Sequence, residues 1–563
     1  MKKISSVSTI VVVLASLFLL TGCKKKAGAD GGVDSSTYSG AAVKGDWKVE
    51  WLTANPEGLN PIVGNDGYAS DVYAYIFDTL IFFDVETGDP KPRIAESWTI
   101  SKDGMTYDFH LRKDVKFHDG QPLTAEDIKF TYDSIMNPKV DSAALRNYLA
   151  DIKEVQVITP DHIRFVMKRP YFRNLIVLGL LYIIPKHIYG KGEMNTNPKN
   201  RAPIGSGPYV FGNWDIGRSI ELNRNKDWWG MNTEYFKSRF NFDRILFRVI
   251  TEQAVAAMAL KKGEIDVLEP TPTMYLQDFG DKNFEDTHYR MKYSTDDGNG
   301  YRYIGWNFKK PLFQSKEVRQ ALAHLMPRDE INERMFENLL TPAIGPFPAG
   351  SSKNDSSLKP LTYDKAKAAE LLAAAGWKEK DREGYLLKDG KRFSFQLLFS
   401  AGSAEAERIA LIYQQSLKES GIDMNIRTLE WTVFIKQRQE RKFDAVMMSW
   451  TSSLDGDPYQ IWHSSQEAGQ GSNAGAYANK RVDELLEKAR TTLDRDERNK
   501  LYQEISRIIF DDQPYLFLFE RPHLFVATKR FAGVLPLGKL GLDSSRWFTP
   551  AGSEKYKTAA VSE

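Results

Sequence analysis

Hydrophobic and polar residues alternate along residues 104–117, and this period of two predicts a half-buried strand. One face would carry Tyr107, Phe109 and Leu111, and the other would carry Asp108, His110 and Arg112. A turn at Asp119-Gly120 follows the strand. Thr124 then has the character of a helix N-cap with Asp127 as its acidic N3 partner, and Asn137-Pro138 would end the helix.

The helical period recurs in several later segments, which are separated by short apolar runs typical of buried strands. Helices are predicted over residues 251–260, with Thr251 as the cap, and over 363–375, 409–417, 482–489 and 501–508. Strands are predicted over 393–399, 424–429, 443–450 and 515–519. Helices that alternate with buried strands favour α/β lobes with partly parallel sheets.

The N-terminus differs from the rest of the chain. Lys2 and Lys3 precede an apolar run over residues 10–20, and Leu20-Thr21-Gly22-Cys23 follows it. The run is shorter than the roughly 20 apolar residues that span a bilayer, but it has the length of a signal-peptide core. The Leu-Thr-Gly-Cys sequence resembles the bacterial lipobox, in which the cysteine becomes the lipid-bearing N-terminus. We therefore predict a signal peptide over residues 1–22 and lipidation of Cys23; an ordinary secreted protein is the alternative.

Cys23 is the only cysteine of the 563 residues, so disulfides, thiolate metal sites and a catalytic cysteine in the mature chain are excluded. Residues 23–45 are rich in Lys, Gly, Ala, Ser and Asp and predict a flexible tether. The lysines at 24–26 would either lie against anionic headgroups or be solvated.

The remaining chain has a globular composition, with 42% hydrophobic and 27% charged residues, and its length predicts two or three lobes. The net charge of +2 offers no basic excess for nucleic acid. The next-longest apolar run, residues 175–184, stops at Pro185 and is too short to cross a membrane.

Motifs of catalysis are missing from the sequence. The Gly-Lys pairs at Gly190, Gly390 and Gly538 lack the Ser or Thr of a phosphate-binding loop. Ile204 occupies the first glycine position of a Gly-x-Ser-x-Gly motif around Ser206. The eight histidines are scattered singly, which argues against a multi-histidine metal site. We therefore expect a protein that is not an enzyme and has no cofactor or metal.

An ordered series of short segments remains to be explained. The segments 95–98, 102–112, 115–120 and 124–127 read Ala-Glu-Ser-Trp, Lys-Asp-Gly-Met-Thr-Tyr-Asp-Phe-His-Leu-Arg, Val-Lys-Phe-His-Asp-Gly and Thr-Ala-Glu-Asp. They resemble the hallmark block of the family 5 solute-binding proteins, which are oligopeptide, dipeptide and nickel receptors of ABC importers. The resemblance continues, in the family's order, at 203–209, 263–266, 307–308, 318–322, 374–377 and Trp450 to Pro458.

The resemblance implies an α/β fold of the periplasmic-binding-protein type (type II, cluster C), with two α/β lobes, an extra inserted lobe and a ligand cleft between lobes. Lobe I would comprise residues 46–75, 203–300 and 531–550, lobe II would be the insertion 76–202, and lobe III would span 301–530. Residues 551–563 would form a C-terminal tail. Two crossings would join lobes I and III, and the solute would be enclosed by domain closure.

A zwitterionic peptide requires an acidic group for its ammonium and polar backbone groups for its main chain. In peptide receptors of this family an aspartate follows the tryptophan of the late loop, which makes Asp455 the candidate here. The family's aspartate stands three residues before the acidic residue of the Asp/Glu-Pro pair, whereas Asp455 stands two before Asp457 and Leu454 occupies the expected position. Trp450, Thr451 and Asp457 belong to the same candidate loop.

Other expected lining residues are Asn55, after the first strand, and the two tryptophans Trp306 and Trp431, which would wall the cleft. Core packing is the alternative for each tryptophan, and turn formation is the alternative for Asp455 and Asp457.

The sequence thus predicts a monomeric receptor, anchored by lipid in the periplasm or at the outer face of the cell membrane, that captures oligopeptides and delivers them to an ABC transporter permease. The altered aspartate spacing keeps a second solute class open: a nickel chelate, haem, an oligosaccharide or an opine. An extracytoplasmic hydrolase and a structural lipoprotein or adhesin are the alternatives from other classes.

Overall fold

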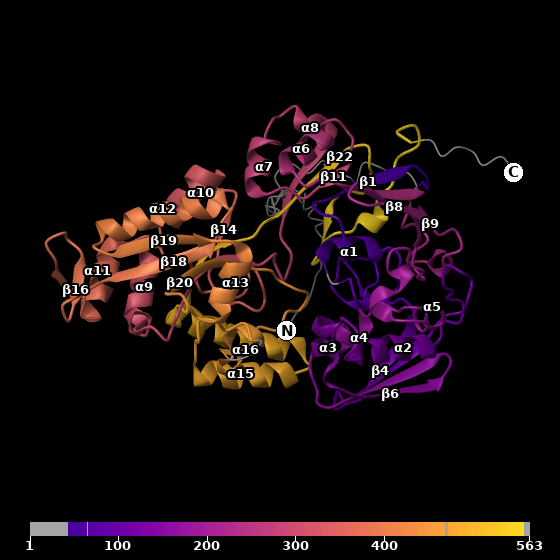
Figure 1. The fold of residues 1–563 in the computed structure, drawn as a ribbon, viewed down its shortest axis with the longest axis horizontal. Helices are drawn as coiled ribbons and strands as arrows, with labels where there is room; N and C mark the ends of the chain where they lie inside the picture. Colours follow the sequence, from indigo (N-terminus) through magenta and orange to yellow (C-terminus); the bar gives the residue numbers. More distant parts are fainter. Residues whose placement is uncertain (1–42, 65, 468–470, 557–563) are drawn as a thin grey trace, which may run out of the picture.

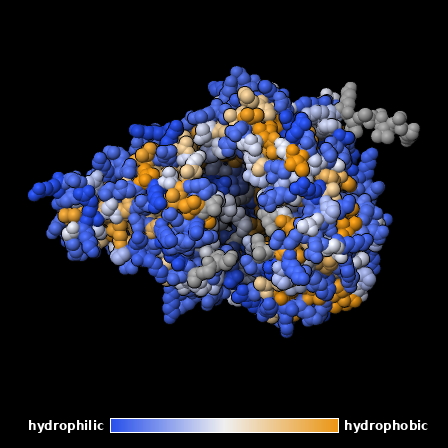
Figure 2. Space-filling view, in the orientation of Figure 1, coloured by the Kyte–Doolittle hydropathy of each residue, from blue (hydrophilic) through white to orange (hydrophobic). Residues whose placement is uncertain are grey.

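A computed structural model describes residues 43–64, 66–467 and 471–556. Cys23, the signal peptide and most of the tether lie outside these residues. The described chain forms three sheet-centred bodies (Figure 1) around a central hollow, which Figure 2 shows as a depression between the two halves of the surface.

The first body contains two sheets. One has the strand order β1-β10-β9-β8, and the other has the order β11-β22-β12. β1 pairs with β10 in parallel, and the remaining neighbours in both sheets are antiparallel. The strands are β1 (Trp47–Leu52), β8 (Tyr209–Asp215), β9 (Ser219–Arg224), β10 (Arg244–Val249), β11 (Val267–Leu268), β12 (His288–Tyr293) and β22 (His523–Thr528). The helices are α1 (Gly67–Tyr73), α6 (Gln253–Lys261), α7 (Pro272–Gln277) and α8 (Phe284–Thr287).

The second body is an antiparallel sheet of order β4-β5-β7-β6 covered by short helices. The elements are β4 (Ala95–Ile100), β5 (Thr106–Leu111), α2 (Ala125–Met136), α3 (Ala143–Leu149), β6 (Ile152–Thr159), β7 (His162–Met167), α4 (Asn174–Gly179) and α5 (Lys186–Tyr189). The alternation predicted for β5 is confirmed, because Tyr107, Phe109 and Leu111 are buried. The predicted capping box is present as well, since the side chain of Asp127 accepts from the N–H of Thr124.

The third body is a mixed sheet of order β14-β21-β13-β20-β18-β19 with helices on both faces. β18 runs parallel to β19 and β20, which confirms the partly parallel sheet. The strands are β13 (Tyr301–Trp306), β14 (Thr341–Pro342), β18 (Ser394–Ser400), β19 (Asp423–Leu429), β20 (Ala445–Trp450) and β21 (Tyr515–Glu520). The helices are α9 (Lys316–His324), α10 (Arg328–Phe336), α11 (Lys365–Ala374), α12 (Ala404–Glu419), α13 (Trp431–Gln439), α14 (Tyr459–Trp462), α15 (Lys480–Thr491) and α16 (Arg495–Asp512).

Caps explain where several predicted helices start. Helix α11 starts two residues after the predicted start at Tyr363, because Asp364 is its N-cap and the carboxylate of Asp364 accepts from the N–H of Lys367. Thr251 does not cap α6, because Glu252 is the N-cap and its side chain makes no capping bond. The predicted ends hold better: Gly263, Gly376 and Gly421 all have the positive φ that glycine adopts without steric cost.

Two adjacent connections join the first and third bodies. One runs from β12 to β13 through residues 294–300, and the other runs from β21 to β22 through residues 521–522. They are bonded to each other, since the N–H of Arg521 donates to the carbonyl of Gly300 at 2.9 Å and the amide of Asn299 donates to Pro522 at 3.3 Å. A pair of short, adjacent crossings is the arrangement of a hinge.

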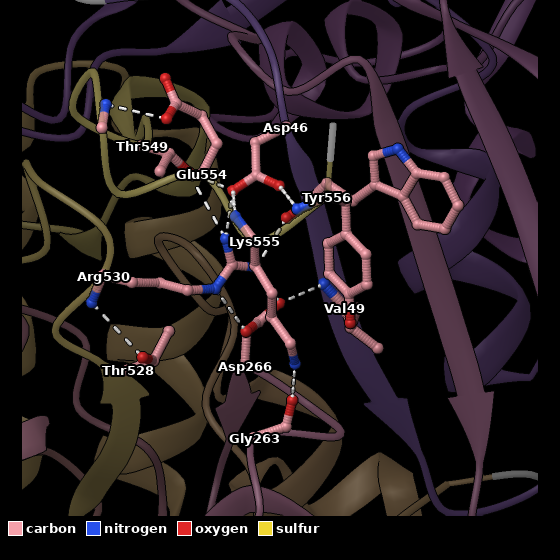
Figure 3. A network of polar contacts seen from close by, with 12 residues as sticks. Asp46, Val49, Gly263, Asp266, Thr528, Arg530, Thr549, Glu554, Lys555 and Tyr556 are labelled. Carbon is pink, nitrogen blue, oxygen red and sulfur yellow. Dashed lines mark hydrogen bonds and ion pairs between the residues drawn. The ribbon is translucent and has the colours of Figure 1, made fainter. Parts of the chain in front are cut away.

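The beginning and the end of the described chain are fixed together in the first body. Arg530 forms ion pairs with Asp46 and with Asp266 (2.6 Å), and Asp46 also accepts from the N–H of Tyr556 at 2.9 Å (Figure 3). Asp266 in turn accepts from the N–H of Val49 at 2.8 Å. These contacts tie β1 to the C-terminal segment, so both crossings emerge from a braced body.

The exact lobe borders remain a prediction. Strand pairing bears on one of them, because β22 is bonded to β11 and β12 of the first body, whereas the prediction assigned residues 523–528 to lobe III. Within the described residues, no helix combines the length and the apolarity needed to cross a membrane.

Candidate functional site

Helix α1 borders the central hollow on the side of the first body (Figures 1 and 2). Its N-cap Asp66 accepts from the N–H of Ala69 at 2.7 Å, and Ala69 and Val72 are buried. Tyr68 and Asp71 of this short helix are exposed.

Asp71 lies within range of the charge of Glu269, the residue that follows β11. Both residues are exposed to water, yet desolvation by surrounding protein, followed by the charges of Glu50, Glu269 and Asp66, raises the pKa of Asp71 to about 7. Desolvation and the charge of Glu50 likewise raise the pKa of Glu269. Within the described residues neither carboxylate has a hydrogen bond or an ion pair. We call Asp71 and Glu269 the acidic face.

A third carboxylate lies near the acidic face but is already neutralised. Glu50 on β1 contacts the buried ammonium of Lys48 at 2.6 Å and accepts from the hydroxyl of Tyr75 at 3.1 Å. Burial opposes the charge on Lys48, but Glu50 and Tyr75 outweigh it, so the pKa of Lys48 is raised. Glu50 is thus a structural partner whose residual field disfavours ionisation of Asp71 and Glu269.

On the connection between β21 and β22, Arg521 is a cation without a partner. Its residue is exposed, yet desolvation and the nearby charge of Arg302 lower the pKa of Arg521, while Glu405 opposes this shift. Glu405 is itself engaged, since it contacts Arg302 at 2.5 Å. No hydrogen bond or ion pair of the Arg521 guanidinium exists among the residues that the structure describes.

Two other arginines show what a structural arginine looks like in this protein. Burial lowers the pKa of Arg319 and of Arg328 as well. Arg319 donates to the carbonyls of Phe313, Gln314 and Asp512, however, and Arg328 donates to those of Phe517 and Leu361. Arg521, in contrast, is exposed and has no such acceptor among the residues that the structure describes, so its guanidinium is open to a partner from solution.

Asp455, the residue predicted to bind an ammonium, belongs to a closed ion network. Its carboxylate contacts Arg498 of α16 at 2.7 Å and Lys353 at 3.0 Å, and Lys353 also contacts Asp297 at 2.7 Å. The N–H of Asp455 donates to Asp297 at 2.9 Å. Burial alone would raise the pKa of Asp455, but Lys353 and Arg498 hold it below its usual value. Two cations and two carboxylates balance, so no charge is left for a solute.

The neighbouring loop residues have structural contacts too. Asp457 accepts from the hydroxyl of Tyr171 at 2.9 Å, and this bond joins the second body to the third. Within the third body, Asp457 forms an ion pair with Arg490 at 2.9 Å. Trp450 ends β20, where its ring lies over Tyr303 and receives Arg438 at 5.4 Å from the ring centroid. Thr451 is exposed.

The three remaining predicted lining residues have different environments. Trp306 is fully buried and stacks on Phe313 at 5.0 Å, so the core alternative describes it. The side chain of Asn55 accepts from Trp214 and Gly217 and thereby holds the β8–β9 turn. Trp431 is 56% exposed at the start of α13 and, with Ile435 and Gln439, borders an open depression of about 520 Å³. Of these three residues, only Trp431 has a side chain exposed enough to contact a solute.

The arrangement offers binding groups rather than a reactive centre. Across the described ranges, no three His, Cys, Asp or Glu side chains come together in a way that would hold a metal ion. Charges of both signs have no ion pair among the described residues: the carboxylates of the acidic face and the guanidinium of Arg521 on one crossing of the hinge. Such a hollow suits a dipolar solute.

Sequence comparison decides the family. Residues 89–472 match the model of the bacterial extracellular solute-binding proteins, family 5, middle region. The chain belongs to this family.

Relatives of this family 5 protein cover nearly its whole length. It is 32% identical to the oligopeptide-binding protein AppA of Bacillus subtilis over 91% of this chain and 92% of the relative. The structure of B. subtilis AppA in complex with a nonapeptide matches with a TM-score of 0.71 over 90% of this chain and 99% of that chain, at 31% identity. The structure of NikZ from Campylobacter jejuni in complex with Ni(L-His) matches with a TM-score of 0.73 at 28% identity, over 90% and 99% of the two chains.

These matches confirm the family and the periplasmic-binding-protein-like α/β fold expected from the ordered motifs. Sequence reasoning missed Asp71, Glu269 and Arg521. A single sequence of 74 acidic and 76 basic residues gives no sign of which charges fold into ion pairs and which do not. Only the position of Arg521 beside Pro522, in a short connection between two buried strands, is visible beforehand.

Proposed function

We propose that this family 5 protein is an extracytoplasmic receptor that captures peptides in the hollow between its first and third bodies and delivers them to an ABC transporter permease. The observation that carries the proposal is that the acidic face and, on one crossing of the hinge, Arg521 bear opposite charges and have no ion pair among the described residues. A peptide brings an ammonium and a carboxylate, so it would neutralise both without any further group.

The acidic face replaces Asp455 in this proposal. An ammonium that reached Asp455 would have to displace Lys353 or Arg498, whose side chains are only 5% and 4% exposed, and leave a buried cation without its partner. Asp71 and Glu269 have no such partner to lose. Ionising the two carboxylates next to an ammonium would also relieve the repulsion that raises their pKa values.

Peptide binding is favoured over the other solutes by relatives as well as by charge. The B. subtilis relative is an oligopeptide-binding protein whose solved structure contains a nonapeptide. A nickel chelate is the second candidate, because the structure of C. jejuni NikZ contains nickel with histidine. An amino-acid chelate also carries charges of both signs, so its binding remains an outcome of the test.

Mass spectrometry of the protein as isolated from its host, followed by calorimetry with the released solute, tests the proposal. We expect peptides to be released on mild denaturation and to rebind. Release of a metal chelate or haem, or the absence of binding to any pool from dipeptide to nonapeptide, would reject peptide capture.

We also propose that the receptor works as a monomer at the outer face of the membrane, held by lipid on Cys23, and that it does not turn over its solute. Cys23→Ser should release the protein from the membrane fraction, whereas Ser16→Ala in the apolar run should not. An unchanged distribution of Cys23→Ser would contradict the anchor.

A further inference from the structure

The segment of residues 170–173, which connects β7 to α4, reaches across from the second body to the third. The hydroxyl of Tyr171 donates to the carboxylate of Asp457 at 2.9 Å. The main-chain N–H of Phe172 donates at 3.0 Å to the carbonyl of Arg490, in the last turn of α15. In Figure 1, α3 and α4 of the second body face α15 and α16. Two consecutive residues of the second body are thus bonded to the third.

Two arginines of the third body also lie over the aromatic rings of this segment. The guanidinium of Arg490 is 4.9 Å from the ring centroid of Tyr171. The guanidinium of Arg498 is 4.1 Å from the ring centroid of Phe172. Each arginine also forms an ion pair with an aspartate of its own body, at 2.9 and 2.7 Å respectively. The third body therefore offers two oriented cations, and the segment supplies the two rings that they contact.

The two bodies that meet here share no hydrophobic core. One buried cluster joins the second body to the first, since it contains Phe109 and Phe165 together with Phe247 of β10. Among the described residues, no such cluster contains side chains of both the second and the third body. The chain connects the third body to the first, through the crossings 294–300 and 521–522, and not to the second. Polar contacts between bodies that neither the chain nor a core joins are typical of an interface that opens and closes.

The interface is also imperfect, which favours its reversibility. Arg173 donates to the carbonyl of Leu454 at 3.4 Å, which is a long hydrogen bond. The Nε of Arg173 is buried, and it has no hydrogen-bond partner in the part of the chain that the structure describes. Water would satisfy this nitrogen once the bodies separate. The cost of burying Arg173 therefore offsets part of what the contacts of Tyr171 and Phe172 contribute.

The loop that receives the segment is bonded to the hinge as well. The N–H of Asp455 donates at 2.9 Å to Asp297, which lies on the crossing 294–300. The carboxylate of Asp455 holds Arg498, the arginine that lies over Phe172. These bonds connect one crossing of the hinge to the place where the second body is held.

We propose that residues 170–173 form a latch that fastens the second body to the third when the receptor closes. The proposal rests on capture of the solute in the hollow, and it adds what holds the closed state besides the solute. The latch contacts are made by protein groups alone, so they stabilise closure by the same amount for every solute. They therefore raise affinity without changing selectivity.

The first test measures affinity by calorimetry. The double variant Tyr171→Ala, Phe172→Ala removes both rings and the hydroxyl bond, and Tyr171→Phe removes the hydroxyl bond alone. The double variant should bind each peptide pool that the wild type binds, from dipeptide to nonapeptide, about 10- to 100-fold more weakly and by one common factor. Tyr171→Phe should lower the same affinities by a smaller common factor.

Tyr363→Phe is the matched control for the hydroxyl. The hydroxyl of Tyr363 accepts from Ser416 at 3.2 Å, and both residues belong to the third body. This substitution removes a hydroxyl bond away from the latch, so the peptide affinities should equal those of the wild type.

The second test measures closure without any solute, by double electron–electron resonance. Cys23 is the only cysteine, so in a Cys23→Ser chain spin labels at Lys153→Cys on β6 and Lys488→Cys on α15 report the separation of the second and third bodies. Both positions are exposed. The wild-type segment should give a larger population of the short distance than the double variant, and saturating peptide should bring both to the short distance.

Each contrary result is distinct. Equal distance distributions of the wild-type segment and the double variant without solute would reject the latch, whether or not peptides bind. A variant that weakens one peptide pool and spares another would show that the segment contacts the solute, and this result would reject the latch too. If the wild type bound no peptide while the distances still differed, peptide capture would be rejected and the latch would stand. Thermal melting checks that each variant folds; Tyr171→Phe, which keeps the ring, decides if the double variant does not.

Discussion

Two acidic regions of this protein look alike in sequence and differ in the fold. Asp455 lies among Lys353, Arg498 and Asp297, where each charge has an opposite charge within 3.0 Å. Asp71 and Glu269 have no ion pair among the described residues, and the charges that act on them come from other carboxylates. The pKa of Asp455 is accordingly lowered and the pKa values of Asp71 and Glu269 are raised. A carboxylate that stabilises a fold and one that awaits a cation are distinguished by their partners.

The ion network around Asp455 has a mechanical consequence. Asp297 lies on one crossing of the hinge, Lys353 comes from the segment before α11, and Arg498 comes from α16. The network therefore clamps the crossing to the third body. The acidic face has no comparable contact across the hollow, so a solute can be recognised there without breaking a structural bond.

The largest expected effect is on stability and tests the structural role of Asp455, the carboxylate that has cationic partners. Asp455→Ala leaves Arg498 and Lys353 buried without their shared carboxylate, which costs about 3 kcal/mol of unfolding free energy. Urea denaturation monitored by tryptophan fluorescence measures this loss. Asp114→Ala, at an exposed position, should change the unfolding free energy by less than about 0.5 kcal/mol. If Asp455→Ala kept the wild-type urea midpoint but lost peptide binding, Asp455 would be a solute-binding residue and not a structural one.

The next effect is on peptide affinity and tests the role of the acidic face. The double variant Asp71→Asn, Glu269→Gln should bind free-amine peptides about 10- to 100-fold more weakly, because it loses the charge-assisted contacts to the ammonium. N-acetylated peptides should bind the variant and the wild type alike, as measured by calorimetry. The double variant Glu96→Gln, Asp114→Asn, at two exposed positions, serves as the control of equal charge change. A double variant that keeps its preference for the free amine would show that the acidic face does not hold that end.

The smallest effect is the pH dependence of stability. The pKa of Asp71 in the fold, about 7, lies above its unfolded value, so the folded state holds the proton more tightly. Ionisation therefore destabilises the fold, and stability falls as pH rises from about 4 to 7. Asp71→Asn should melt at a higher temperature than the wild type at pH 8 and at the same temperature at pH 4. Solvent screening limits the gain to at most about 1 kcal/mol, and a higher salt concentration should reduce it.

Local pattern was sufficient for much of the fold. The two-residue period of β5 and the box between Thr124 and Asp127 are set by neighbours in sequence, and both appear as predicted. The cap of α6 failed because Thr251 lies one residue too far from the first helical turn. Trp306 and Trp431 have the same side chain, but one is at the centre of a core and the other is on a helix terminus.

The candidate site was less predictable, since it depends on which charges meet across long sequence separations. Asp455 meets Lys353 and Arg498 only after the third body has folded, and no spacing within the loop indicates these partners. Asp71, Glu269 and Arg521 are defined by the contacts that they lack. Absence of a partner is a property of the whole fold and cannot be read from a motif.

A crystal structure of the protein with a peptide sequenced from the native preparation tests the central claim most directly. The account predicts the terminal ammonium within ion-pair distance of Asp71 or Glu269, with Lys353 and Arg498 still on Asp455. A terminal ammonium bound to Asp455, with those two cations displaced, would contradict it.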